Sequence, residues 1–177
     1  MTGRPEKVEE AARLGFAVAP LPLELPELQA VDAGDVVGEK ARTAYARLSR
    51  PVIVEDSGLE IAAWGGFPGA LVKWLEKTAG AEKITRMLDG FSDRSARAVC
   101  VVAYFDGAEL FHGRGQVDGE IAPRPRGSGG FGWDSIFIPR GETRTFAEMP
   151  PADKDRCSHR RRAWEALVER VPVERLR

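Results

Sequence analysis

The sequence predicts a single α/β domain over residues 1–177, with helices at both ends of the chain and a mixed β-sheet between them. Length and composition allow this, because 177 residues that are 43% hydrophobic suffice for one core of two or three layers. Apolar residues recur at helical spacing near both ends of the chain. The runs between these segments are rich in β-branched residues, which are typical of strands.

The first third of the chain is expected to form two helices separated by a loop. Pro5 stands at the first position of residues 5–14 and Gly15 follows the last, as helices favour, so a short helix is predicted there. The prolines that follow exclude a regular central strand up to residue 32. Apolar residues then recur at helical spacing from Val36 to Leu48, and this second helix is expected to end before Pro51.

The middle of the chain begins with a strand and continues with helix. Residues 51–55 form an uninterrupted β-branched run, which is typical of a strand buried on both faces. This strand is expected to open into a turn at Asp56, where a Ser-Gly pair follows. Residues 70–88 predict two helices broken near Gly80.

The second half of the chain is expected to contain a hairpin, a further strand and a closing helix. A long strand over 95–105 precedes an Asp-Gly pair, which is a strong hairpin signal, and the return strand covers about 108–118. A loop rich in proline and glycine then leads to a strand over 131–138. Residues 151–171 predict the closing helix.

Charge and cysteine usage exclude several classes of protein. The chain has 26 Lys and Arg against 27 Asp and Glu, so its net charge of -1 creates no field that would hold a nucleic-acid polymer. The two cysteines show no CxxC spacing, which indicates a reducing, cytoplasmic setting without structural zinc. No run approaches the ~18 apolar residues of a membrane helix, so no membrane association is expected.

The most informative local feature is the pair of carboxylates at Glu55 and Asp56. They stand where a buried strand is expected to end, which is where α/β folds place their sites. Two carboxylates suit Mg²⁺, which takes one or two of them and completes its coordination with water and substrate phosphates. A simpler alternative is that Asp56 only caps the turn.

Two further segments carry groups suited to a ligand. The glycines of residues 127–132 lead to Phe131 and Trp133, which could stack on a base, although a β-bulge with core aromatics would explain the same pattern. Lys154 and the Ser-His-Arg run at 158–160 could clamp phosphates or contact a base edge. For these residues the simpler alternative is a solvated helix face.

In this order the segments resemble the inosine triphosphate pyrophosphatase family, also called the Ham1-like or XTP/dITP pyrophosphatases. The resemblance implies a long twisted mixed sheet with two lobes around a central nucleotide-binding cleft, and usually a homodimer. It is carried by TGRPEK (2–7), LPELQ (25–29), PVIVEDSGLEI (51–61), GGFPGALVKW (65–74), GGFGWDSIF (129–137) and FAEMPPADKDRCSHR (146–160).

The resemblance also implies roles for individual residues. The metal-binding acid of the family matches Glu27, and its strand-end acid, described as general base and metal contact, matches Asp56 with Glu55 beside it. Asp56, Lys7 and Lys40 are therefore the expected catalytic residues, and the cofactor is Mg²⁺. The residues expected to bind substrate are Thr2, Gly3, Arg4, Lys7, Lys40, Ser57, Lys73, Phe131, Gly132, Trp133, Asp134, Lys154, His159 and Arg160.

The implied reaction is hydrolysis of ITP, dITP or XTP to a monophosphate and pyrophosphate. Polar groups that bind the purine 6-oxygen would reject adenine, because its amino group would leave a buried donor unpaired. One alternative is a pyrophosphatase for another modified nucleotide. A second is a catalytically impaired nucleotide-binding protein, because Arg4 stands where the family has an asparagine. An arginine can contact phosphate but cannot accept a hydrogen bond.

The last helix is expected to break near Ser158. Lys154 and Ser158 are one turn apart, whereas His159 and Arg160 would point to other faces of an unbroken helix. A break with the Ser158 hydroxyl capping the following helix would bring these side chains to one place.

Overall fold

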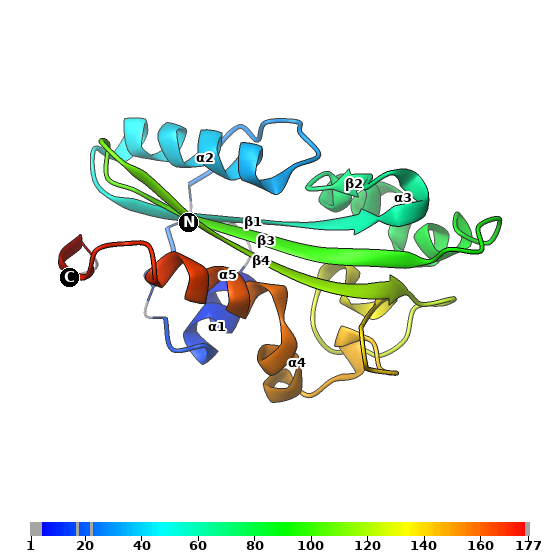
Figure 1. The fold of residues 1–177 in the computed structure, drawn as a ribbon. Helices are drawn as coiled ribbons and strands as arrows, with labels where there is room; N and C mark the ends of the chain where they lie inside the picture. The colour runs from blue at the N-terminus through cyan, green and yellow to red at the C-terminus, as the bar shows by residue number, and fades with distance from the viewer. Residues whose placement is uncertain (1–4, 17, 22, 176–177) are drawn as a thin grey trace.

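The computed structural model describes residues 5–16, 18–21 and 23–175, which form a single α/β domain (Figure 1). In these ranges every helix falls short of the length and apolar character needed to cross a bilayer. The helices are α1 (Pro5–Arg13), α2 (Ala33–Leu48), α3 (Val72–Arg86), α4 (Pro151–Cys157) and α5 (His159–Val168), with 3-10 turns η1 (Ala62–Trp64), η2 (Gly132–Ile136), η3 (Phe146–Glu148) and η4 (Val173–Arg175).

The described strands form one five-stranded sheet in the order β2-β1-β3-β4-β5, and every neighbouring pair is antiparallel. The α/β class is confirmed, but the expected mixed sheet is wrong for these strands. Strands β2 and β3 run in the same direction, but β1 lies between them, so no parallel pair forms. The strands are β1 (Val52–Ile61), β2 (Pro68–Gly69), β3 (Ser95–Phe105), β4 (Leu110–Ile121) and β5 (Phe137–Pro139).

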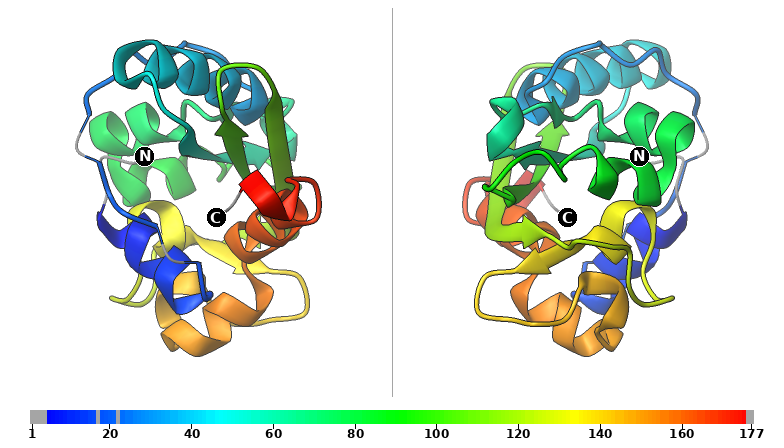
Figure 2. Two further views of the ribbon diagram at one scale, coloured as in Figure 1. Left: turned by 90° about the vertical axis from the view of Figure 1, so that its left-hand side faces the viewer. Right: turned by 90° about the vertical axis from the view of Figure 1, so that its right-hand side faces the viewer.

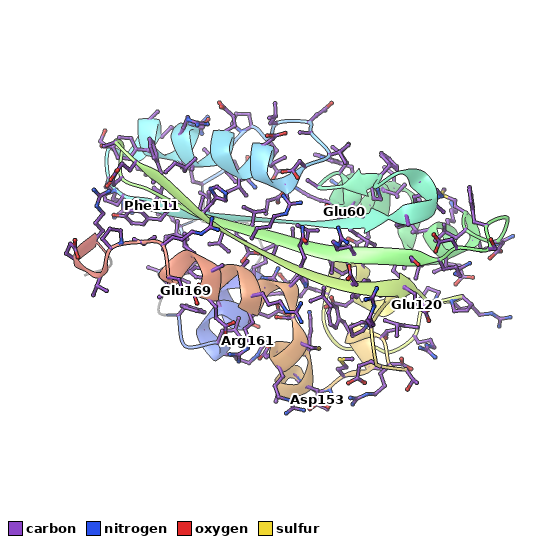
Figure 3. The ribbon with its side chains drawn as sticks, in the orientation of Figure 1. Glu60, Phe111, Glu120, Asp153, Arg161 and Glu169 are labelled. Carbon is purple, nitrogen blue, oxygen red and sulfur yellow. The ribbon has the colours of Figure 1, made fainter. Side chains whose placement is uncertain are left out.

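The long strands twist along their length, as the figures show. Phe111 lies at one end of them, and Glu60 and Glu120 lie at the other (Figure 3). Figure 2 views the sheet from these two ends, with α2 at the top and α4 at the bottom. The predicted hairpin after β3 is confirmed, because Phe105 pairs with Leu110 across it.

Strand β1 continues through the point where a turn was predicted. Ser57 pairs with Cys100 and Gly58 pairs with Val99, so the expected turn at Asp56 is wrong. A Cβ at Gly58 would lie less than 3.0 Å from the backbone of Gly69. The glycine therefore serves the close approach of β2 and not a turn. Because side chains alternate along a strand, Glu55 and Asp56 face opposite sides of the sheet.

The three parts of the core explain where a cleft can form. Helix α2 covers one face of the sheet over β1 and β3. On the opposite face, α1 and α5 cover one half, while α3 and η2 cover the other half. Helix α3 is kinked at Gly80, which has a positive φ of 77°, as predicted. The middle of β1 lies at the junction between these two halves.

The C-terminal third differs from expectation in one element and agrees in another. Residues 131–138 were predicted as a strand, but most of them form η2, because Asp134 accepts a 2.8 Å hydrogen bond from the backbone of Phe131 and closes a turn. The predicted break at Ser158 is confirmed. Its hydroxyl accepts a 3.1 Å hydrogen bond from Arg161 N and caps α5.

Candidate active site

A cleft opens at the middle of β1 and collects most of the residues expected to form the site. Helix α1, the start of α3, the η2 turn and the first turn of α5 contribute its other walls. It is lined by Lys7, Glu27, Asp56, Ser57, Ala70, Val72, Lys73, Glu76, Phe131, Gly132, Trp133, Asp134, His159 and Arg160. The expected central cleft is therefore present.

One end of the cleft carries Glu27 and Asp56, two of the three carboxylates expected to bind metal. Lys40 Nζ lies 3.1 Å from Glu27 Oε1 and 3.7 Å from Asp56 Oδ1, so both carboxylates meet at one ammonium group. Lys73 Nζ also donates to Glu27, at 2.8 Å. Helices α2 and α3 thus each bring a lysine to the loop that holds Glu27.

The same end contains carboxylates with opposite pKa shifts. Burial raises the pKa of Asp56, and the nearby Lys7 and Lys40 only partly oppose this. Burial also disfavours the charged form of Glu27, but hydrogen bonds and charges from Lys73 and Lys40 outweigh it and lower its pKa to about 2. Asp56 is therefore the more basic of the two.

Glu55 has partners that its neighbour lacks. On the opposite face of β1 it accepts hydrogen bonds from Arg160 Nε at 3.0 and 3.1 Å and from Trp164 Nε1 at 3.3 Å. Lys7 Nζ lies 3.4 Å from the same carboxylate. Strand alternation turns Glu55 to the face of β1 opposite Asp56, and the expected metal contact of Glu55 stays a prediction. Glu55 joins Lys7 to α5.

Buried charges that pair with one another surround the other end of the cleft, and of these Asp134 and Arg160 line it. Lys154 Nζ donates to Glu10 Oε1 at 2.6 Å and also to Asp134. Arg160 donates to Glu10 as well as to Glu55. Lys154 and Arg160 are 3% and 1% exposed, so the alternative of a solvated helix face is wrong for them.

His159 lies at this end between two aromatic rings. Its ring centroid is 5.3 Å from that of Trp133 and 5.9 Å from that of Phe146. Within the described part of the chain neither ring nitrogen has a hydrogen-bond partner. Burial and the nearby Arg160 and Lys154 charges hold the pKa of His159 well below 6.5. The ring is therefore neutral near pH 7 and keeps one donor and one acceptor.

Phe131 presents its ring beside these cations. Lys154 Nζ lies 4.8 Å and Arg160 Cζ 5.5 Å from its centroid, within cation–π range. Lys154 itself lines an adjoining cavity on the side of Phe131 that faces α1. The expected contacts of Thr2, Gly3 and Arg4 lie outside the described residues.

Sequence reasoning missed Glu10, whose carboxylate joins the two buried cations. The signal was present, since Lys7, Glu10 and Ala11 share one face of α1 and all three are buried. A short helix that turns two opposite charges toward the core needs charged partners there. Glu10 finds Lys154 and Arg160, and Lys7 finds Glu55, none of which a local pattern connects to α1.

The chain is similar to known proteins over most of its length. The model of the Ham1 family matches residues 1–170. A dITP/XTP pyrophosphatase of Thermococcus kodakarensis is 46% identical over 167 residues, which cover 92% of this chain and 90% of that protein. An inosine triphosphate pyrophosphatase of Yarrowia lipolytica is 40% identical over 175 residues, which cover 94% and 91%.

The fold agrees with a solved structure as well. The Ham1 protein of Staphylococcus aureus matches with a TM-score of 0.78 and 28% identity, over 93% of this chain and 92% of that one. Sequence and fold thus agree over nearly the whole length, and this chain belongs to the Ham1 family.

Proposed function

We propose that this chain is a Mg²⁺-dependent pyrophosphatase that hydrolyses ITP, dITP and XTP to the monophosphate and pyrophosphate. The observation that carries this is one cleft with two unlike ends: Lys40 joins Glu27 to Asp56 at one end, and aromatic rings and buried cations surround Phe131 at the other. A nucleoside triphosphate also has two unlike ends, a charged triphosphate that binds metal and lysines, and an aromatic base. The names of relatives that are 46% and 40% identical support the same reaction.

The end of the cleft that holds Glu27 and Asp56 suits a divalent metal bound together with the phosphates. The described residues contain no group of three or more His, Cys, Asp or Glu that could hold a metal. Two carboxylates are the number that Mg²⁺ takes when phosphate oxygens and waters complete its coordination. Glu27 and Asp56 would hold the ion, which supplies positive charge to the triphosphate when bound.

The side chains around the metal site would divide the remaining work. Asp56, with its raised pKa, would orient and deprotonate the water that attacks the α-phosphorus. Lys7 and Lys40 would neutralise the pyrophosphate leaving group, and Lys73 would contact the outer phosphates once they displace it from Glu27. Positioning of this kind supplies most of the catalysis in phosphoryl transfer.

The other end would select the base. Arg160 and Lys154 only donate hydrogen bonds, which suits the 6-oxygen of hypoxanthine or xanthine. An adenine amino group would set donor against donor, and discrimination through an unpaired buried group is large. The neutral His159 ring adds one donor and one acceptor for the base edge. Phe131 would stack on the purine.

Assembly and location follow the resemblance to the family. Residues 1–177 would act as one domain, and two copies would form a homodimer in the cytoplasm. Phe67 and Trp74 are 43% and 47% exposed and supply apolar surface for such contact. Light scattering of the purified protein measures the mass directly. A monomeric mass at all concentrations would exclude the dimer without affecting the proposed reaction.

The test of the reaction requires purified protein, Mg²⁺, a panel of nucleotides, and separate assays for pyrophosphate and orthophosphate. We expect pyrophosphate from ITP and XTP, with kcat/KM above that for ATP by ~100-fold or more, and an intermediate value for GTP. Equal rates with ATP and ITP would contradict base selection. Orthophosphate in place of pyrophosphate would contradict the bond assignment. Tight binding of ITP without turnover would favour the nucleotide-binding alternative.

A further inference from the structure

Helix α5 lies in direct backbone contact with strand β4, at two glycines. A Cβ at Gly115 would lie less than 3.0 Å from His159 O and Ala163 N. A Cβ at Gly113 would lie less than 3.0 Å from Ala163 O and Leu167 N. Real Cβ atoms essentially never come so close, so the distance between helix and strand exists only because both positions are glycine.

Arg162 of α5 and Arg170, which follows the helix, both donate hydrogen bonds to β4. Arg162 Nη1 donates to Gln116 O at 2.6 Å, and Arg170 Nη1 donates to His112 O at 2.8 Å. Both side chains are exposed, and they bind β4 on either side of the two glycines along the strand. Figure 3 shows α5 running from Arg161 toward Glu169 and the Phe111 end of the sheet.

The contacts of Gly115 and Arg162 hold a different part of the chain from those of Gly113 and Arg170. The Gly115 contact and the Arg162 bond lie at the first turn of α5, which carries His159 and Arg160. The Gly113 contact begins at Ala163, which the Gly115 contact also reaches, and extends to Leu167, and the Arg170 bond lies after the end of α5. None of these residues lines the cleft. The first turn of α5 and the segment from Ala163 onward are thus each held to β4 by one glycine contact and one arginine hydrogen bond.

We propose that Gly115 and Arg162 are positioning residues, which fix the first turn of α5 and thereby the base-binding side chains that it carries. The inference rests on the proposed function, in which those side chains contact the purine. Neither residue lines the cleft, and both act through the helix backbone.

A methyl group at Gly115 has to displace the carbonyl of His159, because backbone atoms surround the position. Displacement of the ring and of the Arg160 guanidinium weakens contacts made to the base in both the ground state and the transition state. Such a change raises KM more than it lowers kcat. Misplacement by about 1 Å lowers the rate roughly a hundredfold at well-aligned sites, so kcat/KM for ITP is expected to fall at least tenfold here.

The first experiment compares Gly115→Ala with Gly113→Ala, which introduce the same group on the same strand. Both are expected to lower stability to a similar extent, because both force apart the same two elements. Only Gly115→Ala is expected to raise KM for ITP at least tenfold and to lower the ITP:ATP ratio of kcat/KM. An unchanged ratio in Gly115→Ala, or an equal loss in Gly113→Ala, would overturn the proposal.

A second pair of variants answers the case in which the glycine variants fail to fold. Arg162→Met and Arg170→Met each remove one exposed hydrogen bond to β4 and leave the core intact. Arg162→Met is expected to lower the ITP:ATP ratio, and Arg170→Met is expected to leave it at the parental value. Equal ratios in the two variants would overturn the proposal as well.

A spectroscopic readout separates this inference from the proposed function. The chain has two histidines, of which His112 is exposed and His159 lies between the Trp133 and Phe146 rings. The NMR ring signals of His159 should therefore shift in Gly115→Ala and Arg162→Met, and remain in Gly113→Ala and Arg170→Met. Unmoved signals in the first two variants overturn the positioning role. Shifted signals in a protein that releases no pyrophosphate support it while the proposed function fails.

Discussion

The two ends of the cleft hold their charges in different ways. At the end beside Phe131, the charged groups of Glu10, Lys154 and Arg160 are almost wholly buried and bind one another. At the end beside Asp56, the side chains of Glu27 and Lys73 are 29% and 44% exposed, and their ion pair can exchange with water and ligand. Separating a buried ion pair is costly because each charge would be left without a partner, whereas an exposed ion pair contributes little to stability.

The difference indicates how each end would meet its ligand. A base with a fixed outline is recognised best by groups that are already fixed, since no reorganisation is needed on binding. A flexible triphosphate with a metal needs lysines that can leave Glu27 and follow the phosphates. The cleft thus combines a preformed end with an end that rearranges.

The largest effect is expected from breaking the buried network. Glu10→Gln keeps the shape but removes a charge shared by Lys154 and Arg160, so the free energy of unfolding should fall by about 3–5 kcal/mol. Urea denaturation measures this. The control is Glu9→Gln on the exposed face of α1, which should stay within about 0.5 kcal/mol of the parent. Similar losses in both variants would show that the buried end is not held by its ion pairs.

Acid should unfold the protein by titrating carboxylates of the same network. The Arg160 and Lys7 charges overcome burial and hold the pKa of Glu55 at about 2, below its usual 4.5. A lowered pKa stabilises the fold above about pH 4.5, and this contribution, of about 3 kcal/mol, is lost as pH falls toward 2. Denaturation midpoints measured between pH 6 and pH 2 should therefore fall less steeply in Glu55→Gln. A steeper fall in that variant would contradict the assignment.

A smaller effect on stability but a loss of turnover is expected at the other end. Asp56→Asn removes the charge and the proton acceptor, so kcat for ITP should fall at least ~100-fold. Because burial raises the pKa of Asp56, removing its charge should not lower the free energy of unfolding. Glu60→Gln, on the same strand and the same face, is the matched control for activity. Parental turnover in Asp56→Asn would exclude it as general base.

The smallest effect concerns the metal. Glu27→Gln should raise the Mg²⁺ concentration needed for half-maximal rate by about tenfold, equivalent to about 1.4 kcal/mol, and should change nucleotide affinity less. Rates measured across a Mg²⁺ titration give the first quantity, and ITP titration without metal gives the second. An unchanged Mg²⁺ requirement would remove Glu27 from the metal site.

How much of this the sequence could predict depends on whether the causes were local. The break at Ser158 was predictable, because residues 154–160 could not share one site on an unbroken helix. The continuation of β1 through Gly58 was not, because its cause is the approach of β2 from another part of the chain. The same holds for η2, where the side chain of Asp134 overrides a strand-like pattern.

The site shows the same division. Most expected residues line the cleft, because the family resemblance supplied positions that no single motif could. The pairing of Glu55 with Arg160, and the part that Glu10 takes in the site, depend on how α1 and α5 pack together, which local sequence does not encode. Pairing between distant elements, and not the choice of residue types, was the unpredictable part.

The most direct test of the central claim is the fate of isotope from water. Hydrolysis of ITP in ¹⁸O-labelled water, followed by mass spectrometry of both products, shows which phosphorus the water attacks. If the Asp56 end of the cleft directs water to the α-phosphorus, one ¹⁸O enters the inosine monophosphate and none enters the pyrophosphate. Label in the pyrophosphate and unlabelled monophosphate would contradict the account, because the water would then have attacked the β-phosphorus.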